Sequence, residues 1–394
     1  MWLSDLQIVL PERVIERGSL RIEGEHIAAI TEGPARPAAG ETVVEGSGLV
    51  AIPGIIDLHG DMIEHEIEPR PGARFPLDLA VHELDKRLAG CGVTTAYAAI
   101  SFWGENDDDA LRSATRGGEL AAAINALRPT LLVDMFVHAR YEVPTPSVAP
   151  GLAALLEARH IHLLSLMDHT PGQGQYRDLE HFVAFIAKLR NADPDVIAAE
   201  ARERMRKSRQ PDTWETASAL VASAVEQGLL IASHDDDAPT KVGLMADFHV
   251  TISEFPVTLD AALEAQRRGM HVVMGAPNVL RGVSHSGNLS ALDAIAAGAV
   301  DALASDYAPS ALLQAAFVVA NKGLLPLHDA IKLVGQNPAA ALHLHDRGRL
   351  DVGMAADIAL VEPGACPRVR GTIRRGVAAY WDSAMARRST AAPR

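Results

Sequence analysis

The strongest constraint on the fold of this chain is a repeated alternation between short apolar runs that end in polar residues and Ala/Leu-rich stretches of helical period. The eight apolar runs are Leu49–His59, Val93–Ile100, Thr130–Val143, His162–Asp168, Leu229–His234, Ala246–Ile252, His271–Met274 and Ala302–Asp306. Most of the stretches between them have the spacing of amphipathic helices. Eight parallel strands with intervening helices, over roughly 250–300 residues, are what a closed barrel needs. The pattern therefore predicts an α/β protein with a (β/α)8, TIM-type barrel.

The two ends of the chain have a different pattern, in which short strands are separated by clusters of Pro, Gly and Glu. Residues 1–50 are too few to bury both faces of a sheet, and similar strands return in residues 344–383. We therefore expect these two pieces to pair as one small, discontinuous β-sandwich domain, with the barrel of residues 51–343 inserted in it. Residues 384–394 are basic and rich in small side chains, which predicts a disordered tail.

Composition excludes several classes of protein. The 394 residues carry a formal net charge of −14, which argues against a nucleic-acid binder and against a binder of anionic membranes, since both need a basic surface. We find no run of about 18 apolar residues and no basic, apolar leader, so we expect a cytoplasmic protein. Two cysteines cannot form a disulfide framework or a thiolate zinc site, so any metal must be held by His and carboxylates.

The first apolar run carries the clearest candidate for a metal site. Residues 52–61 read IPGIIDLHGD, so a hydrophobic strand ends in His59-x-Asp61. Because side chains alternate along a strand, these two point to the same side at its carboxyl end. There an imidazole and a carboxylate can bind one metal ion. The alternative interpretation is a hydrogen-bonded pair at a strand end.

Four other predicted strands also end in titratable side chains. These residues are His138, Arg140, Glu142, Asp168, His169, His234, Asp235 and Asp306. Barrel enzymes build their active sites at the carboxyl ends of the strands. Histidines of an ordinary core do not account for five of eight strands that end in His, Asp or Glu. The sequence therefore predicts a catalytic metal site at this face.

These residues resemble the amidohydrolase superfamily of metal-dependent hydrolases. The similarity extends over nearly the whole chain: a Pro-Gly-x-x-Asp-x-His entry at residues 53–59, Asp306 at the last strand, and the sequences NPAAAL at 337–342 and DRGRLDVGMAAD at 346–357. In the superfamily the last of these segments returns the chain into its β domain. The resemblance implies a metal-dependent hydrolase with a barrel and an attached β domain.

Longer motifs resemble one subgroup, the PhnM family of the carbon–phosphorus lyase pathway. These motifs are His59–Pro71, Met167–Gln175, Ser233–Pro239, Ser253–Thr258, Met274–Asn288 and Leu303–Pro309. This resemblance implies hydrolysis of α-D-ribose 1-methylphosphonate 5-triphosphate to the 5-phosphate and pyrophosphate, in phosphonate catabolism. The implied partner is thus a small phosphorylated sugar phosphonate. A homo-oligomer is neither required nor excluded by the sequence.

The resemblance also suggests roles for the residues at the strand ends. The expected metal ligands are His59, Asp61, Glu142, His169, His234 and Asp306, with Glu142 as the bridge between two ions and Asp306 as the general base. Two departures leave the number of ions and the bridging group open. The superfamily usually opens with His-x-His, and its sixth strand usually ends in His, where this chain offers His249 and Glu254. Zn²⁺ is the expected metal, with Mn²⁺ or Fe²⁺ as alternatives, because mixed nitrogen and oxygen ligands do not select sharply among these ions.

A triphosphate substrate needs cations, and the strongly negative net charge makes their local positions informative. Arg140, Lys241 and Arg281 lie at the predicted active face, and Asn278 and His285 lie in polar loops that could donate to a phosphate. These five are the expected substrate-binding residues.

The charged segment Asp178–Thr216 has two interpretations, a solvated helical face or a lid over an anionic ligand.

Two other functions compete with hydrolysis of the triphosphate. One is a deaminase or cyclic-amide hydrolase on the same scaffold, and the other is a non-catalytic barrel that serves as an assembly subunit. Neutral rings need few cations and a triphosphate needs several. The number of cations at the site therefore distinguishes a triphosphate hydrolase from a deaminase or cyclic-amide hydrolase. An intact metal cage argues against the scaffold.

Overall fold

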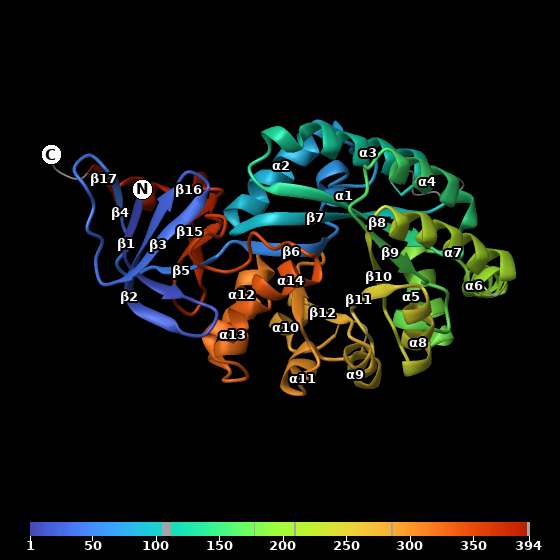
Figure 1. The fold of residues 1–394 in the computed structure, drawn as a ribbon. Helices are drawn as coiled ribbons and strands as arrows, with labels where there is room; N and C mark the ends of the chain where they lie inside the picture. The colour runs from blue at the N-terminus through green and yellow to red at the C-terminus, as the bar shows by residue number, and fades with distance from the viewer. Residues whose placement is uncertain (105–111, 177, 209, 285–286, 392–394) are drawn as a thin grey trace.

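The centre of the molecule is a parallel β-barrel (Figure 1). The computed structural model describes residues 1–104, 112–176, 178–208, 210–284 and 287–391. The barrel strands are β6 (Ile55–Gly60), β7 (Val93–Phe102), β8 (Asp134–Glu142), β9 (Leu163–Met167), β10 (Leu230–His234), β11 (Val250–Glu254), β12 (His271–Gly275) and β13 (Ala302–Ala304). They follow one another in chain order around the sheet, and a bridge between Gly60 and Asp306 closes the ring. The predicted (β/α)8 fold class is confirmed.

Helices cover the outside of the barrel, so its strands are buried on both faces. Strands β7 and β9 are buried at every position, and for this reason they are continuous apolar runs without alternation. The longer covering helices are α2 (Leu77–Gly90), α3 (Ala114–Leu127), α4 (Ala149–Glu157), α7 (Pro211–Glu226), α8 (Pro239–Asp247), α9 (Leu259–Arg267) and α12 (Ala311–Asn321). Shorter helices are α1 (Ile63–Ile67), α10 (Ala276–Arg281), α11 (Ala291–Ala296), α13 (Leu327–Lys332) and α14 (Gln336–Ala341). The run expected to start at Ala246 becomes a strand only at Val250, because α8 continues to Asp247.

The two ends of the chain form one separate sheet at the side of the barrel (Figure 1). Its strands are β1 (Trp2–Val9), β2 (Val14–Glu23), β3 (His26–Glu32), β4 (Thr42–Glu45), β5 (Val50–Pro53), β14 (Ile358–Glu362), β15 (Arg368–Arg374), β16 (Val377–Trp381) and β17 (Ser389–Ala391). The first apolar run is therefore two strands: β5 pairs with β14 in this sheet, and β6 enters the barrel.

The end of the described chain differs from the disorder that its composition predicts for residues 384–394. Residues Ser383–Ala386 form α15, capped by the Asp382 carboxylate, and β17 pairs with β4. The Arg388 guanidinium also donates to the backbone of Glu45 and Ser47. Composition does not show that β4 offers a free edge, and the hydrogen bonds to that edge order this segment.

The charged segment Asp178–Thr216 folds into helices outside the barrel ring. Helices α5 (Leu179–Arg190) and α6 (Pro194–Ser208) pack on each other around a small apolar cluster of their own, which includes Ile197 and Ala201. The turn after α6 is tied to α7, because the Thr213 hydroxyl and the Trp214 indole donate to backbone carbonyls at the end of α6.

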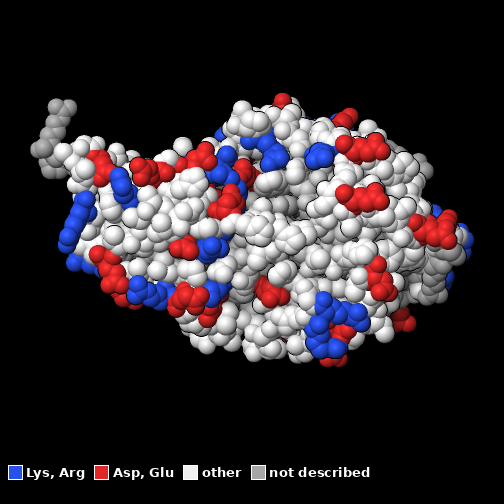
Figure 2. Space-filling model, in the orientation of Figure 1, with Lys and Arg blue, Asp and Glu red and all other residues white. Residues whose placement is uncertain are grey.

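Basic and acidic side chains are interspersed on the face of the molecule that Figure 2 shows. Within the described ranges, no helix combines the length and the apolar character needed to cross a membrane.

Arg347 joins the β domain to the amino-terminal end of the barrel. Its guanidinium is 6% exposed and donates to the Asp134 carboxylate at 2.6 Å, to the Thr95 hydroxyl at 3.0 Å and to the Asp346 carboxylate at 2.8 Å. The first two partners belong to β8 and β7, near the starts of these strands. The contact therefore fixes the segment that leads into β14 at the end of the barrel opposite to the predicted active face.

We expect Arg347→Met to lower the free energy of unfolding by about 3–5 kcal/mol, because it removes the partner of a partly buried carboxylate group. The midpoint of urea denaturation measures this effect. The matched control is Arg349→Met, which breaks a 3.6 Å pair between exposed side chains and should cost less than about 1 kcal/mol. Equal midpoints for the two variants would contradict the role of Arg347.

Candidate active site

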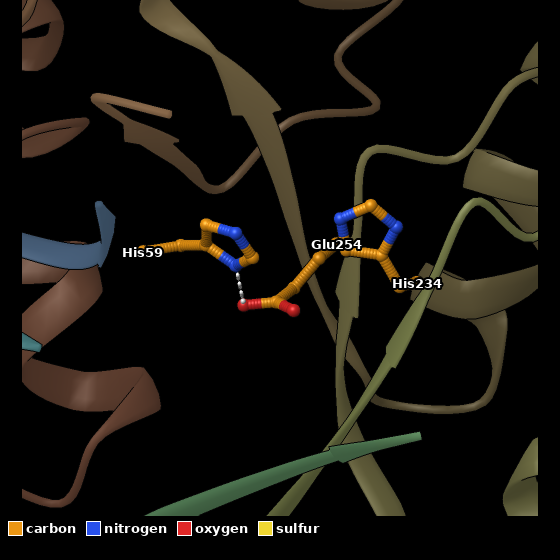
Figure 3. Close-up of side chains that lie close together, drawn as sticks. All are labelled: His59, His234 and Glu254. Atoms are coloured by element: carbon orange, nitrogen blue, oxygen red, sulfur yellow. Dashed lines mark hydrogen bonds and ion pairs between the residues drawn. The ribbon is translucent and has the colours of Figure 1, made fainter. Parts of the chain in front are cut away.

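Four barrel strands bring a buried cluster of imidazoles and one carboxylate together at the barrel axis. The Nδ1 atom of His59 lies 3.0 Å from Oε1 of Glu254, and Nε2 of His138 lies 3.8 Å from Oε2 of the same carboxylate. The Ser165 hydroxyl donates to that Oε2 at 3.0 Å. His234 completes the group, with its ring centroid 5.4 Å from that of His59 (Figure 3).

A second cluster lies nearer to the solvent and shares His234. Nδ1 of His169 makes a very short contact with Oε1 of Glu142, and its Nε2 lies 3.7 Å from Oδ2 of Asp235. That Asp235 oxygen is 3.2 Å from Nδ1 of His234. Burial opposes a charge on His169, but the Glu142 carboxylate outweighs this effect and raises the pKa of the imidazole.

The deeper cluster fits a metal centre in its geometry and in its protonation. Both nitrogens of His138 are buried and make no hydrogen bond with any described residue. Burial lowers the pKa of His138 to about 3 and that of His59 well below its usual range, so both imidazoles are neutral, which is the form that binds a metal. A bound metal ion would account for buried imidazole nitrogens that have no hydrogen bond.

Two groups of described residues offer ligand atoms close enough to hold one ion each. They are His59, His234 and Glu254, and His169, His234 and Asp235. His234 belongs to both. His234 is therefore the residue that connects the two groups of ligand atoms.

Asp306 follows β13 at the point where the barrel closes. Its backbone N–H donates to the His59 carbonyl at 3.0 Å, and its own carbonyl accepts from Asp61 N–H at 2.8 Å. Its φ of 55° lies in the left-handed region, which is uncommon for Asp and typical of functional sites. Burial, together with the Asp61 carboxylate, raises the pKa of Asp306 to about 6.

Buried hydroxyls and carboxylates behind the cluster fix the backbone of the strand ends. The Asp57 carboxylate accepts from the Ser305 hydroxyl at 2.5 Å and from its N–H at 3.0 Å, which joins β6 to the residue after β13. The Asp236 carboxylate accepts from the Ser233 and Ser253 hydroxyls, which joins the ends of β10 and β11. Burial raises the pKa of both carboxyls.

A cavity of about 430 Å³ opens above this cluster. Arg140 and Arg281 line it, and Nη1 of Arg140 lies 3.5 Å from Oδ2 of Asp61. Asn278 also lines it, but its amide is bonded to the backbone of Leu289 and Ala291 and thus organises the neighbouring loop.

The other two expected substrate-binding residues are not in this cavity wall. Lys241, in α8, does not line the cavity. Its ammonium nitrogen is buried, and its charge lowers the pKa of Asp235 and opposes the rise in the pKa of Asp236. His285 lies outside the described residues.

The structure thus brings the predicted His59, Asp61, Glu142, His169, His234 and Asp306 to one end of the barrel. Three further members of the site had weaker sequence signals. His138 shares the inner face of β8 with Arg140, Glu254 ends β11, and Asp235 directly follows His234. The signal for each was a titratable side chain at, or in register with, a strand end.

Solved structures of other proteins share the fold of this chain. The N-acetyl-D-glucosamine-6-phosphate deacetylase of Mycobacterium smegmatis has a TM-score of 0.64 at 15% identity, covering 96% of this chain and 99% of its own. The β-aspartyl dipeptidase of Fervidobacterium islandicum AW-1 has a TM-score of 0.63 at 16% identity, covering 97% and 96%. A family model described as "Amidohydrolase family" matches residues 198–380. The barrel, its attached β domain and the histidine–carboxylate cluster define an amidohydrolase-type hydrolase.

A relative by sequence narrows the class. The chain is 34% identical over 378 residues to the alpha-D-ribose 1-methylphosphonate 5-triphosphate diphosphatase of Escherichia coli strain K12, with 91% of this chain and 94% of the relative covered. The chain therefore belongs to the family of this diphosphatase. The resemblance found in the sequence motifs is confirmed.

Proposed function

We propose that this protein hydrolyses α-D-ribose 1-methylphosphonate 5-triphosphate to the 5-phosphate and pyrophosphate. The observation that carries the proposal is the 34% identity to the diphosphatase over nearly the full length of both chains. The site supports it with a polar cavity that two arginines line. Hydrolysis of a cyclic amide on the same scaffold would not need these cations.

We assign the metal ligands to the two clusters. His59, His234 and Glu254 form one candidate ligand set, and His169, His234 and Asp235 form the other; a neutral imidazole offers one lone pair, so His234 would bind an ion in one of the two sets at a time. Zn²⁺ is the proposed metal. The carboxylates of Asp61 and Glu142 would be additional metal ligands beside these two groups. A bound divalent ion supplies a water of lowered pKa and offsets charge on phosphoryl oxygens.

The remaining steps belong to side chains of this chain. Asp306 accepts a proton from the attacking water, since a carboxyl whose pKa is raised toward neutrality is suited to take up and release a proton. Arg140 and Arg281 bind anionic oxygens of the substrate in the cavity. The Asp57 and Asp236 networks hold the strand ends, and so keep Asp306 and His234 in place.

The test is pyrophosphate release from this triphosphate by protein reconstituted with Zn²⁺, with metal content measured on the same sample. We expect pyrophosphate and the 5-phosphate in equal amounts, at one or two equivalents of metal. A metal-loaded protein that released no pyrophosphate but opened a cyclic amide or deaminated an amine would overturn the proposal. Loading with Mn²⁺ and Fe²⁺ in parallel tests the choice of metal.

We propose that this reaction takes place in the cytoplasm. Cys91 is partly buried and Cys366 is exposed, and both are free thiols. Free cysteines suit a reducing compartment.

A further inference from the structure

A second cavity, of about 540 Å³, adjoins the active site on the side of the inserted helices. Glu142 and His169 form its inner wall, and the end of α6 forms its outer wall with Arg204, Arg206 and Lys207. His169 also lines the first cavity, so the two cavities meet at one member of the proposed metal cluster.

The fold holds the Arg204 guanidinium of this second cavity, and it fixes the backbone of Lys207. The guanidinium carbon of Arg204 lies 5.3 Å from the ring centroid of Trp103, a cation–π contact, and the Trp103 ring is stacked 6.5 Å from that of His169. The backbone carbonyl of Lys207 accepts from the Thr213 hydroxyl of α7, which fixes the last turn of α6.

Two of the three cations are available to a ligand. Arg206 is paired with Glu203 one turn away, at 2.7 and 2.8 Å. In the part of the chain that the structure describes, Arg204 and Lys207 have no carboxylate within ion-pair distance. Anionic ligands are therefore the natural partners of these two side chains.

The two cavities differ in charge. The first has Arg140 and Arg281 against three carboxylates, Asp61, Asp235 and Asp306. Among the described residues, the wall of the second carries three cations and one carboxylate, Glu142, which is already bonded to His169. The second cavity thus suits the more highly charged part of a substrate, and the first suits the less charged part.

We infer that the second cavity binds the two terminal phosphates of the substrate and then the pyrophosphate product, and that Arg204 and Lys207 are the residues that recognise them. The inference rests on the proposed function and adds an orientation to it. The sugar and its phosphonate, which carries a single negative charge, occupy the first cavity. Water hydrolyses the anhydride between the α and β phosphorus atoms, near His169: its oxygen bonds to one of these two phosphorus atoms, and the bond from that phosphorus to the bridging oxygen breaks. The β and γ phosphates then leave as pyrophosphate on the side of α6.

The test compares the binding of the two products to metal-loaded enzyme by calorimetry and as inhibition constants. In the Arg204→Gln, Lys207→Gln double variant we expect pyrophosphate to bind about tenfold more weakly or worse, since two charge-assisted contacts are lost, while ribose 1-methylphosphonate 5-phosphate binds as before. Arg281→Gln should do the reverse. The KM for the triphosphate should rise in both variants.

Arg202→Gln is the matched control, because Arg202 is exposed on the same helix and does not line the cavity. It should leave both products unaffected, and equal metal content in all variants excludes an indirect effect. Unchanged pyrophosphate binding in the double variant, or equally weakened binding of both products, would overturn the inference. The proposed function would still stand in that case if the wild-type enzyme released pyrophosphate from the triphosphate. If the wild type released no pyrophosphate from the triphosphate, the proposed function would fall and the inference with it.

Discussion

Replacing Asp306 by Asn should reduce kcat by about 10²–10⁴-fold, the usual contribution of a general base. Asparagine has nearly the same shape and can keep the backbone bonds to His59 and Asp61, but it cannot accept a proton. The bound metal should stay near the wild-type amount, because the two metal-binding groups do not include Asp306. Steady-state kinetics of pyrophosphate release, with elemental analysis, measure both quantities.

The matched control is Asp260→Asn, which removes a carboxylate from the exposed first turn of α9. It should leave kcat unchanged. An Asp306→Asn enzyme of normal activity would remove Asp306 from the mechanism. A variant that lost metal together with activity would make it a ligand rather than a base.

Replacing His234 by Ala should abolish detectable turnover and most of the bound metal. His234 is the one residue that belongs to both groups of close ligand atoms among the described residues, so its loss weakens both sites at once. Elemental analysis after dialysis against a metal buffer measures the effect.

Single-site variants separate the two groups. Glu254→Gln affects only the deeper group and Asp235→Asn only the outer one, so each should lower the metal content less than His234→Ala. His26→Ala, on the exposed surface of β3, is the control and should retain all the metal. Unchanged metal in His234→Ala would show that the ions bind elsewhere.

The sequence predicted the barrel well because its strands differ from their surroundings in a way that burial requires. Val93–Ile100 lies within β7, and Leu229–His234 differs from β10 by one residue. Prediction was poorer where a strand boundary depends on a distant partner. β5 separates from β6 within one apolar run because β14 pairs with β5, and β17 is ordered because it pairs with the edge of β4 that β1 leaves open.

For the site, the period of a strand predicts the face of a side chain but not its depth in the barrel. His138 and Glu142 share a face of β8, yet His138 lies deep beside Glu254 and Glu142 lies at the mouth beside His169. The register between strands, which places Glu254 opposite His234, decides these neighbours. Local sequence does not contain that register.

Helices after the strands also turn side chains in directions that a loop assignment does not predict. Lys241 follows β10 closely in sequence, but in α8 its ammonium is buried and acts on Asp235 and Asp236 instead of lining the cavity. The cations of α6 belong to a segment for which solvation was one of two interpretations, and its position beside His169 depends on how the inserted helices pack.

The pairing of β5 with β14 has a consequence for how the protein is made. Pro53 and Ile358 lie side by side in the sheet, although the whole barrel separates them along the chain. During synthesis β1–β5 therefore leave the ribosome long before β14. Until β14 is made, the edge of β5 stays unpaired, and an unpaired strand edge can associate with other chains. A nascent chain cut short before β14 would keep that edge exposed, so ribosome-bound chaperones should be needed most for this small sheet and less for the barrel.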